Sequence, residues 1–204
     1  MRLSSGDFEL AESERAVQAT TVLMLDMSFS MPLRGNWEPA KRMALALQSL
    51  IAGKFPEDRF QVIGFSDYAS RLQPRDLLVS GWERVYGTNM QHAFMLARRF
   101  FGAFPGAEQQ VIMVTDGEPT AHLEGDQALF NWPPLPRTLA LTLAEAKRLA
   151  RCGATLNVFL LDHDPGAAVF VEQMVRATGG RIFYPDLDNL GSMVVRDFLQ
   201  RRRG

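Results

Sequence analysis

The sequence predicts a doubly wound α/β fold, in which a mostly parallel central sheet carries helices on both faces. Short apolar stretches that suit strands alternate along the chain with amphipathic stretches of roughly 12–16 residues that suit helices. Two of the apolar stretches end in an aspartate, at Asp26 and Asp116. The chain has 204 residues, of which 47% are hydrophobic and 22% charged, and this composition fits a globular domain with a substantial core.

Apolar runs and partial alternation identify the strands. The stretch TTVLMLDM is apolar on both of its faces until it reaches Asp26, which is typical of a strand buried in a parallel sheet. The stretch QVIMVTDG has the same character before Asp116. We expect five core strands and one short edge strand, over residues 20–27, 58–65, 69–73, 110–117, 154–162 and 180–184.

Apolar residues at helical spacing identify the helices between these strands. Asn36 and Asp164 stand where helices begin, and Gly53 and Gly153 stand where helices end. The predicted helices cover residues 36–53, 90–104, 138–153, 164–178 and 187–202. We expect one helical turn and a loop over 74–85, and a long polar, proline-rich loop over 118–137. Right-handed crossovers then place helices on both faces of the sheet.

Bulk properties narrow the class of protein. The formal net charge is −1, so the chain lacks the basic surface of a nucleic-acid-binding protein. The single cysteine, Cys152, cannot form a disulfide within the chain and favours a reducing compartment. No stretch has the roughly 18 apolar residues that span a bilayer. We therefore expect a cytoplasmic protein without membrane or nucleic-acid partners, with residues 1–19 as a linker or edge segment and 20–204 as one domain.

Oxygen-bearing side chains follow the first core strand. Asp26 ends the strand, and Ser28 and Ser30 follow at alternate positions. Alternation would place all three side chains on a common side if this loop stays extended. In a doubly wound sheet, ligands bind outside the carboxyl ends of the strands. This edge of the sheet is therefore the candidate functional site.

Two further segments are expected at the same edge. Asp116 ends another core strand, and its carboxylate would face that of Asp26 if the two strands are neighbours. Thr88 lies in a Gly-Thr-Asn turn just before the helix at residue 90, and Gly87 permits a tight turn that directs the hydroxyl back toward the strand ends. Two carboxylates and three hydroxyls form an all-oxygen donor set, which suits a hard divalent cation, Mg²⁺ first, rather than zinc.

These motifs together resemble the metal-ion-dependent adhesion site of von Willebrand factor A domains, over residues 20–200. The resemblance implies a Rossmann-like fold and a protein-binding module that is not an enzyme. It also implies that a bound Mg²⁺, with Mn²⁺ or Ca²⁺ as alternatives, accepts an Asp or Glu side chain from a partner protein. The motifs that carry it are Asp26-x-Ser28-x-Ser30, Thr88 and Thr115-Asp116-Gly117.

The same resemblance assigns roles to the five residues. Ser28, Ser30 and Thr88 correspond to the hydroxyl ligands, and Asp26 and Asp116 correspond to the carboxylates, at least one of which acts through water. Intracellular bacterial members of the family are similar in organisation to partners of MoxR-type AAA+ ATPases, which assemble complexes or insert cofactors. A partner of that class is therefore expected for this chain.

One position departs from the family pattern. Phe29 stands where the family usually has glycine, and a bulky residue does not adopt positive φ cheaply. Either the loop avoids such conformations, or Phe29 packs beside the cation and shapes the partner surface. Trp82 and Trp132 are further candidates for exposed interface anchors, although packing within the chain is the simpler interpretation of each.

Other interpretations remain open from sequence alone. Asp26 and Asp116 could cap loops, and the serines could be ordinary loop hydroxyls. A Mg²⁺-dependent hydrolase or phosphatase would place a second aspartate two residues after the first, where this chain has Ser28. A scaffold with a vestigial metal site is the third possibility. The three histidines show no zinc spacing, although His122, with Glu118 and Glu124, lies close enough to Asp116 to rim the site.

Overall fold

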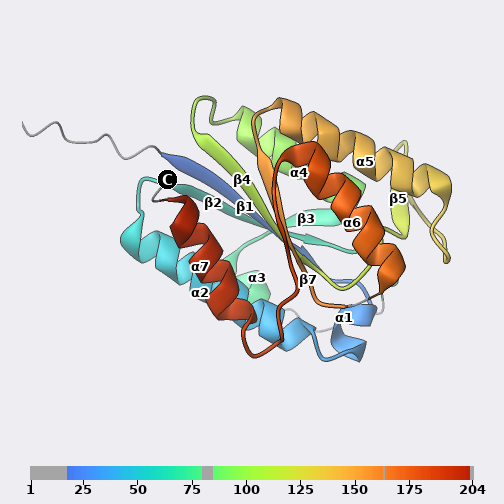
Figure 1. The fold of residues 1–204 in the computed structure, drawn as a ribbon, viewed down its shortest axis with the longest axis horizontal. Helices are drawn as coiled ribbons and strands as arrows, with labels where there is room; N and C mark the ends of the chain where they lie inside the picture. The colour runs from blue at the N-terminus through green and yellow to red at the C-terminus, as the bar shows by residue number, and fades with distance from the viewer. Residues whose placement is uncertain (1–17, 80–84, 163, 203–204) are drawn as a thin grey trace, which may run out of the picture.

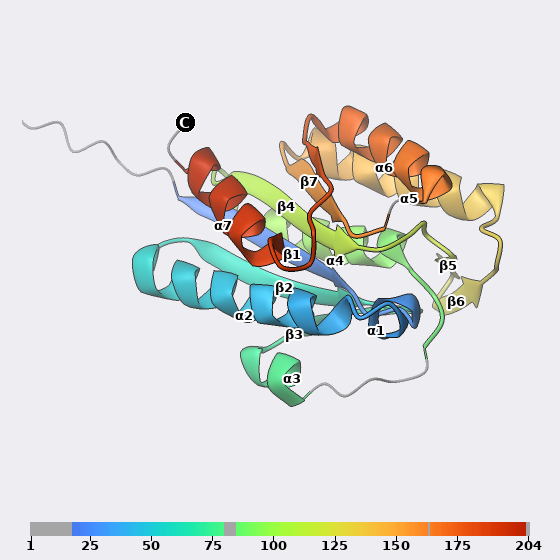
Figure 2. The same cartoon turned by 60° about the horizontal axis from the view of Figure 1, so that its bottom comes forward.

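The computed structural model describes residues 18–79, 85–162 and 164–202 as a sheet covered by helices on both faces (Figures 1 and 2). The strands are β1 Ala19–Asp26, β2 Arg59–Phe65, β3 Ala69–Leu72, β4 Glu108–Thr115, β5 Ala121–Glu124, β6 Gln127–Phe130, β7 Thr155–Leu160 and β8 Ile182–Phe183. The helices are α1 Ser30–Leu33, α2 Trp37–Lys54, α3 Pro74–Val79, α4 Met90–Gly102, α5 Pro136–Arg151, α6 Pro165–Thr178 and α7 Leu190–Arg201.

Six of these strands form the central sheet, in the order β3-β2-β1-β4-β7-β8. All neighbouring pairs are parallel except β2 and β3, which are antiparallel. The doubly wound α/β prediction is therefore confirmed. β1 lies at the centre between β2 and β4, with Leu25 opposite Val114. The carboxyl ends of β1 and β4 thus meet at one edge of the sheet.

Alternate side chains of the central strands pack into two separate hydrophobic cores, one on each face of the sheet. On β1, Val22 and Met24 pack with α4, α5 and α6 on one face of the sheet. Leu23 and Leu25 pack with α1, α2, α3 and α7 on the other face. Both faces of β1 are buried, so its sequence is an uninterrupted apolar run rather than an apolar-polar alternation. This burial explains why the strand was recognisable from sequence.

Helix α6, which precedes the final strand β8, begins with a well-formed cap. The Asp164 side chain accepts a hydrogen bond of 2.9 Å from the backbone N–H of Ala167, and Pro165 occupies the first helical position. Gly179 ends α6 with φ of 69°, a conformation that glycine adopts without strain. The predicted start and end of this helix are confirmed.

The span 118–137 corrects the prediction of a loop without secondary structure. It contains the hairpin of β5 and β6, joined by a two-residue turn in which Gly125 has φ of 60°. Gly-Asp is a recognised hairpin turn signal, and it was present in the sequence between two short stretches of mixed polarity. In the span 74–85, α3 covers Pro74–Val79, and residues 80–84, including Trp82, lie outside the described residues.

Candidate metal site at the carboxyl edge of the sheet

The two strand-end aspartates lie at the expected place. Asp26 is the last residue of β1, and Asp116 follows the last residue of β4. Both side chains are buried. Because β1 and β4 are neighbours in the sheet, the expected adjacency of the two carboxylates is present.

The two serines converge on Asp116 through a turn, not through an extended loop. The hydroxyls of Ser28 and Ser30 share a hydrogen bond of 3.1 Å, and the Ser30 hydroxyl donates to Asp116 Oδ1 at 2.8 Å. Asp26 Oδ1 accepts from the backbone N–H of Ser28 at 2.9 Å. Phe29 has a helical backbone, with φ of −56° and ψ of −30°, and α1 starts at Ser30. The condition of an extended loop is therefore not met, because the Asp26 carboxylate binds the Ser28 amide and the chain turns into α1.

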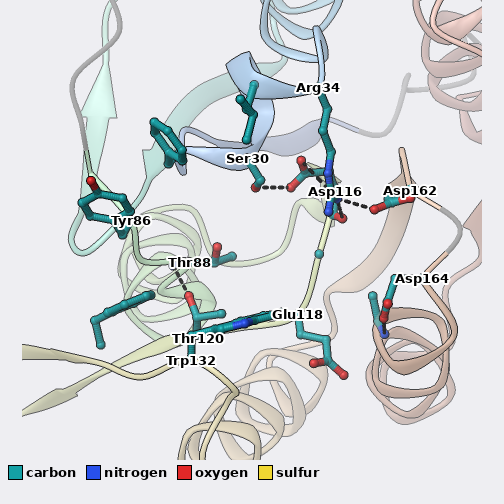
Figure 3. A pocket seen from close by; sticks show the side chains of 15 residues that line it. Ser30, Arg34, Tyr86, Thr88, Asp116, Glu118, Thr120, Trp132, Asp162 and Asp164 are labelled. Atoms are coloured by element: carbon teal, nitrogen blue, oxygen red, sulfur yellow. Dashed lines mark hydrogen bonds and ion pairs between the residues drawn. The ribbon is translucent and has the colours of Figure 1, made fainter.

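Thr88 reaches the same site from the segment before α4. Its backbone N–H donates to Thr120 Oγ1 at 2.9 Å, and its carbonyl accepts from the Thr120 N–H at 3.2 Å. The next residue, Asn89, caps α4 by accepting from the His92 N–H at 2.9 Å. Figure 3 shows the Thr88 hydroxyl pointing into the cavity that Ser30 and Asp116 also line. The structure thus brings all three predicted segments to one edge.

Gly87 is required for close packing and not for an unusual backbone angle. A Cβ at this position would lie 2.9 Å from the Ala121 Cβ and would also collide with Asp67 Oδ1. The same Asp67 oxygen accepts a hydrogen bond of 2.8 Å from the Gly87 N–H. Gly87 has no positive φ, so the expected reason for glycine, a tight turn, is replaced by the approach of its backbone to β5 and Asp67.

The two aspartates are buried close enough for their charges to interact. Burial, and then the nearby Asp116 carboxylate, raise the pKa of Asp26 to about 7, although hydrogen bonds from Ser28 and Thr115 act in the opposite direction. Burial also raises the pKa of Asp116. Two buried carboxylates this close favour a shared proton or a cation. A bound cation would allow both to be ionised.

The donor set fits a hard divalent cation. Two carboxylates and three hydroxyls supply oxygen only, which Mg²⁺, Mn²⁺ and Ca²⁺ accept and which Zn²⁺ favours less. Within the described residues, no group of three or more His, Cys, Asp and Glu side chains is arranged to hold a metal. Neutral hydroxyls must therefore supply a large share of any coordination at this edge.

Three residues that contact Asp116 or each other at this edge were not identified from the sequence. Arg34 forms an ion pair with Asp162, donates to the Asp116 carbonyl at 3.2 Å, and lies 3.7 Å from Asp116 Oδ2. Asn36 donates from Nδ2 to Asp116 Oδ2 at 3.4 Å. Asp162 follows β7 as Asp116 follows β4, so the strand-end rule could have found it. Arg34 and Asn36 carried no such signal, because their contacts depend on how α1 turns.

The cavity at this site has a volume of about 480 Å³ and extends well beyond the hydroxyls and Asp116. Phe29 lines it, with its ring 5.3 Å from that of Tyr86. Of the two outcomes expected for Phe29, the first holds, because its φ is −56° and the loop avoids positive φ. Trp132 also lines the cavity and is exposed, as an interface anchor would be.

Of the histidines and acidic residues expected near this edge, some line the cavity and others do not. His122 is buried, and its Nδ1 shares a hydrogen bond of 2.9 Å with Thr138 Oγ1, so the expectation that it rims the site was wrong. Glu124 pairs with Arg137 at 2.7 Å on the hairpin. Glu118 does line the cavity. His163 lies outside the described residues.

One family model and several relatives match this chain in sequence. A model described as "Rv0959-like protein, vWA domain" matches residues 19–199. The chain is 44% identical over 210 residues to protein Rv0959 of Mycobacterium tuberculosis (strain ATCC 25618 / H37Rv) and to protein Mb0984 of Mycobacterium bovis. All of this chain is covered in each match, but only 31% of each relative, so the chain spans about a third of their length.

Solved structures share the fold at low identity. The PilB minor pilin of Streptococcus sanguinis (D319A mutant) matches with a TM-score of 0.71 and 12% identity, over 91% of this chain and 62% of the pilin. BatB of Bacteroides thetaiotaomicron matches with a TM-score of 0.66 and 17% identity, over 91% of this chain and 98% of BatB. Proximal thread matrix protein 1 of the mussel byssus, solved "with zinc occupied MIDAS motif", matches with a TM-score of 0.60 and 17% identity, over 87% and 46%.

Among the helices of the described ranges, none combines the length and the apolar character that a bilayer crossing demands.

Proposed function

The chain belongs to the von Willebrand factor A domain family, and we propose that its carboxyl-edge site binds a divalent cation, Mg²⁺ first, to capture an acidic side chain of a partner protein. The observation that carries the proposal is the meeting of Ser28, Ser30 and Asp116 in one hydrogen-bonded chain beside the buried Asp26 carboxylate. Thr88 lines the same cavity. The module is proposed to be non-catalytic.

The proposed role of each residue follows from its contacts. Ser28, Ser30 and Thr88 offer neutral hydroxyls, so they hold a cation without cancelling its charge. Asp26 is already engaged by the Ser28 amide and by the Thr115 hydroxyl at 2.5 Å, which suits a carboxylate that acts through water. Asp116 Oδ1 accepts from the Ser30 hydroxyl at 2.8 Å, so a second carboxylate lies directly beside the serines. A bound Mg²⁺ would supply residual positive charge, which attracts a carboxylate from outside.

Titration with Mg²⁺ and with Mn²⁺ tests the metal site. Wild-type protein should show saturable binding heat and a rise in Tm that EDTA reverses, because ligand binding to the folded state stabilises it. The Ser28→Ala/Ser30→Ala double variant should lose both signals. Ser192→Ala removes an exposed hydroxyl on α7 and should behave as wild type. No heat and no Tm shift in the wild type would leave a scaffold with a vestigial site.

A separate experiment tests the class of partner protein. We propose a cytoplasmic setting and an AAA+ ATPase of the MoxR type as the partner class, on the strength of the family resemblance and the single cysteine. A native pull-down should recover the ATPase with wild type in Mg²⁺ and lose it with the serine double variant. Equal recovery with both would show that the metal does not mediate the contact.

A further inference from the structure

The cavity beside the proposed metal site has two unlike walls. Tyr86 and Asp162 lie on opposite sides of Ser30 and Thr88, with Asp164 on the Asp162 side (Figure 3). Its volume of about 480 Å³ lies within the range of roughly 300–1,000 Å³ typical of ligand pockets. A single carboxylate bound at a cation needs far less space. The extra volume therefore accommodates the neighbours of that carboxylate in a partner chain.

One wall is aromatic and open to solvent. The rings of Phe29 and Tyr86 lie 5.3 Å apart, and those of Tyr86 and Phe130 lie 6.3 Å apart. Tyr86 is 56% exposed, Phe130 44% and Trp132 72%. Four of the ten large hydrophobic side chains that are exposed in the described residues line this one cavity, Leu33 being the fourth. Such a concentration marks a recognition surface for a large apolar side chain.

The opposite wall carries two carboxylates, those of Glu118 and Asp164. Glu118 packs against the start of α6, close to the Asp164 carboxylate that caps this helix. Neither residue has an ion pair with Lys or Arg in the described parts of the chain. Among the described residues that line the cavity, Arg34 is the one Lys or Arg, and it is engaged by Asp116 and Asp162. This wall is therefore complementary to a cationic side chain.

We propose that the site takes an extended segment of a partner protein in which an Asp or Glu stands between a large apolar residue and a Lys or Arg. The acidic residue meets the metal site, the apolar residue packs against Tyr86, Phe130 and Trp132, and the cation faces Glu118 and Asp164. The two walls thereby orient the segment in one direction across the sheet edge. The inference rests on the proposed function and defines the partner chemistry of that site.

Selection from a displayed library of random linear peptides tests the inference. The full chain is immobilised in Mg²⁺, and bound peptides are eluted with EDTA. Enriched peptides should share an Asp or Glu, with an aromatic or large aliphatic residue on one side and Lys or Arg on the other. The order of the flanking residues should be the same in most enriched peptides, because the walls differ.

Paired variants assign each preference to its wall, with the affinity of one enriched peptide measured by fluorescence polarisation. Tyr86→Ala should weaken that peptide about tenfold, which is roughly 1.4 kcal/mol, whereas Tyr184→Ala, a similarly exposed tyrosine outside the cavity, should leave it unchanged. Glu118→Gln should weaken the same peptide severalfold. The Glu118→Gln substitution should not weaken binding of a peptide version whose Lys or Arg is replaced by Gln. Glu172→Gln, on the exposed side of α6, is the control for Glu118→Gln and should leave the affinity unchanged.

The outcomes separate the two proposals. Metal-dependent enrichment of an acidic residue without flanking preferences would overturn this inference and leave the proposed function intact. Flanking preferences that persist in Tyr86→Ala and Glu118→Gln would also overturn it. Enrichment that ignores Mg²⁺, or no enrichment, would overturn both the inference and the acidic-partner role, and the metal titration would then show whether cation binding itself survives.

Discussion

At the scale of single residues, the proposed metal site is built on a few short hydrogen bonds at the ends of two strands. The Ser28 amide and the Thr115 hydroxyl hold the Asp26 carboxylate, and the Ser30 hydroxyl holds Asp116. These contacts orient the oxygens before any cation arrives, so little conformational entropy remains to be lost on binding. The cost is the burial of two carboxylates beside each other, which is visible in the raised pKa of Asp26.

Gly87→Ala tests how finely Thr88 is positioned. The added methyl group would overlap Asp67 and Ala121, so the segment that carries Thr88 must shift. We expect Mg²⁺ affinity to fall by roughly tenfold or more in calorimetry, since a shift of about 1 Å disrupts a preorganised site. Gly53→Ala in α2 has no atom within 4 Å of its Cβ and should retain wild-type affinity. Unchanged affinity in Gly87→Ala would contradict a role for Thr88 in the site.

At the scale of elements, the site depends on how α4 is tied to the edge of the sheet. His92 on α4 accepts a hydrogen bond of 3.1 Å at Nδ1 from the backbone N–H of Ala69 in β3. Burial, and then the charge of Arg99, lower the pKa of His92 below its usual value of 6.5. The neutral ring is therefore the form that joins the helix to the strand.

The stability of this junction should depend on pH. Because the folded protein holds the His92 pKa below its unfolded value, the unfolded state binds protons more readily near and below pH 6.5. The free energy of unfolding should therefore fall as the pH is lowered through this range. His92→Asn, whose amide oxygen can accept the same hydrogen bond, should show a shallower decline in urea denaturation between about pH 7.5 and pH 5.5. Parallel curves for the two proteins would refute this role of His92.

At the scale of the whole molecule, the final helix is joined to the sheet by a buried polar network. Asp197 on α7 accepts hydrogen bonds of 2.5 Å from Asn157 Nδ2 in β7 and 2.5 Å from Arg181 beside β8. Arg181 also donates its backbone N–H to Asn157 Oδ1 at 3.0 Å. Asn157 lies near the amino end of β7, whereas the proposed metal site lies beyond the carboxyl ends of the strands, so we expect the network to contribute to stability and not to metal binding.

Asp197→Ala should separate stability from metal binding. The variant leaves Asn157 and Arg181 without their buried partner, which costs on the order of 3 kcal/mol in the free energy of unfolding. Arg176→Ala breaks the exposed pair with Glu172 and should cost less than about 0.5 kcal/mol. Both variants should bind Mg²⁺ as wild type does at temperatures where they are folded. Loss of metal binding in folded Asp197→Ala would show that α7 and the site are coupled.

The sequence by itself determined the central strands, most helices and the candidate oxygen donors. Apolar runs such as TTVLML identify strands that are buried on both faces, and helix caps such as Asp164-Pro165 are local signals. General topology places the carboxyl ends of parallel strands at one edge, but the structure was needed to show that β1 and β4 are neighbours and that Asp26 and Asp116 therefore lie together. The β5–β6 hairpin was missed because its strands are short and its Gly-Asp turn was read as loop.

Only the tertiary structure decided how the site is completed. The serines converge because Asp26 holds the Ser28 amide and α1 starts at Ser30, a local turn that alternation does not describe. Arg34 reaches Asp162, a residue 128 positions away, and no local pattern reports such a contact. The aromatic and acidic walls likewise assemble from α1, the segment before α4, the hairpin and the start of α6. Sequence periodicity specifies which face of an element is buried, whereas cavity shape depends on how the elements pack.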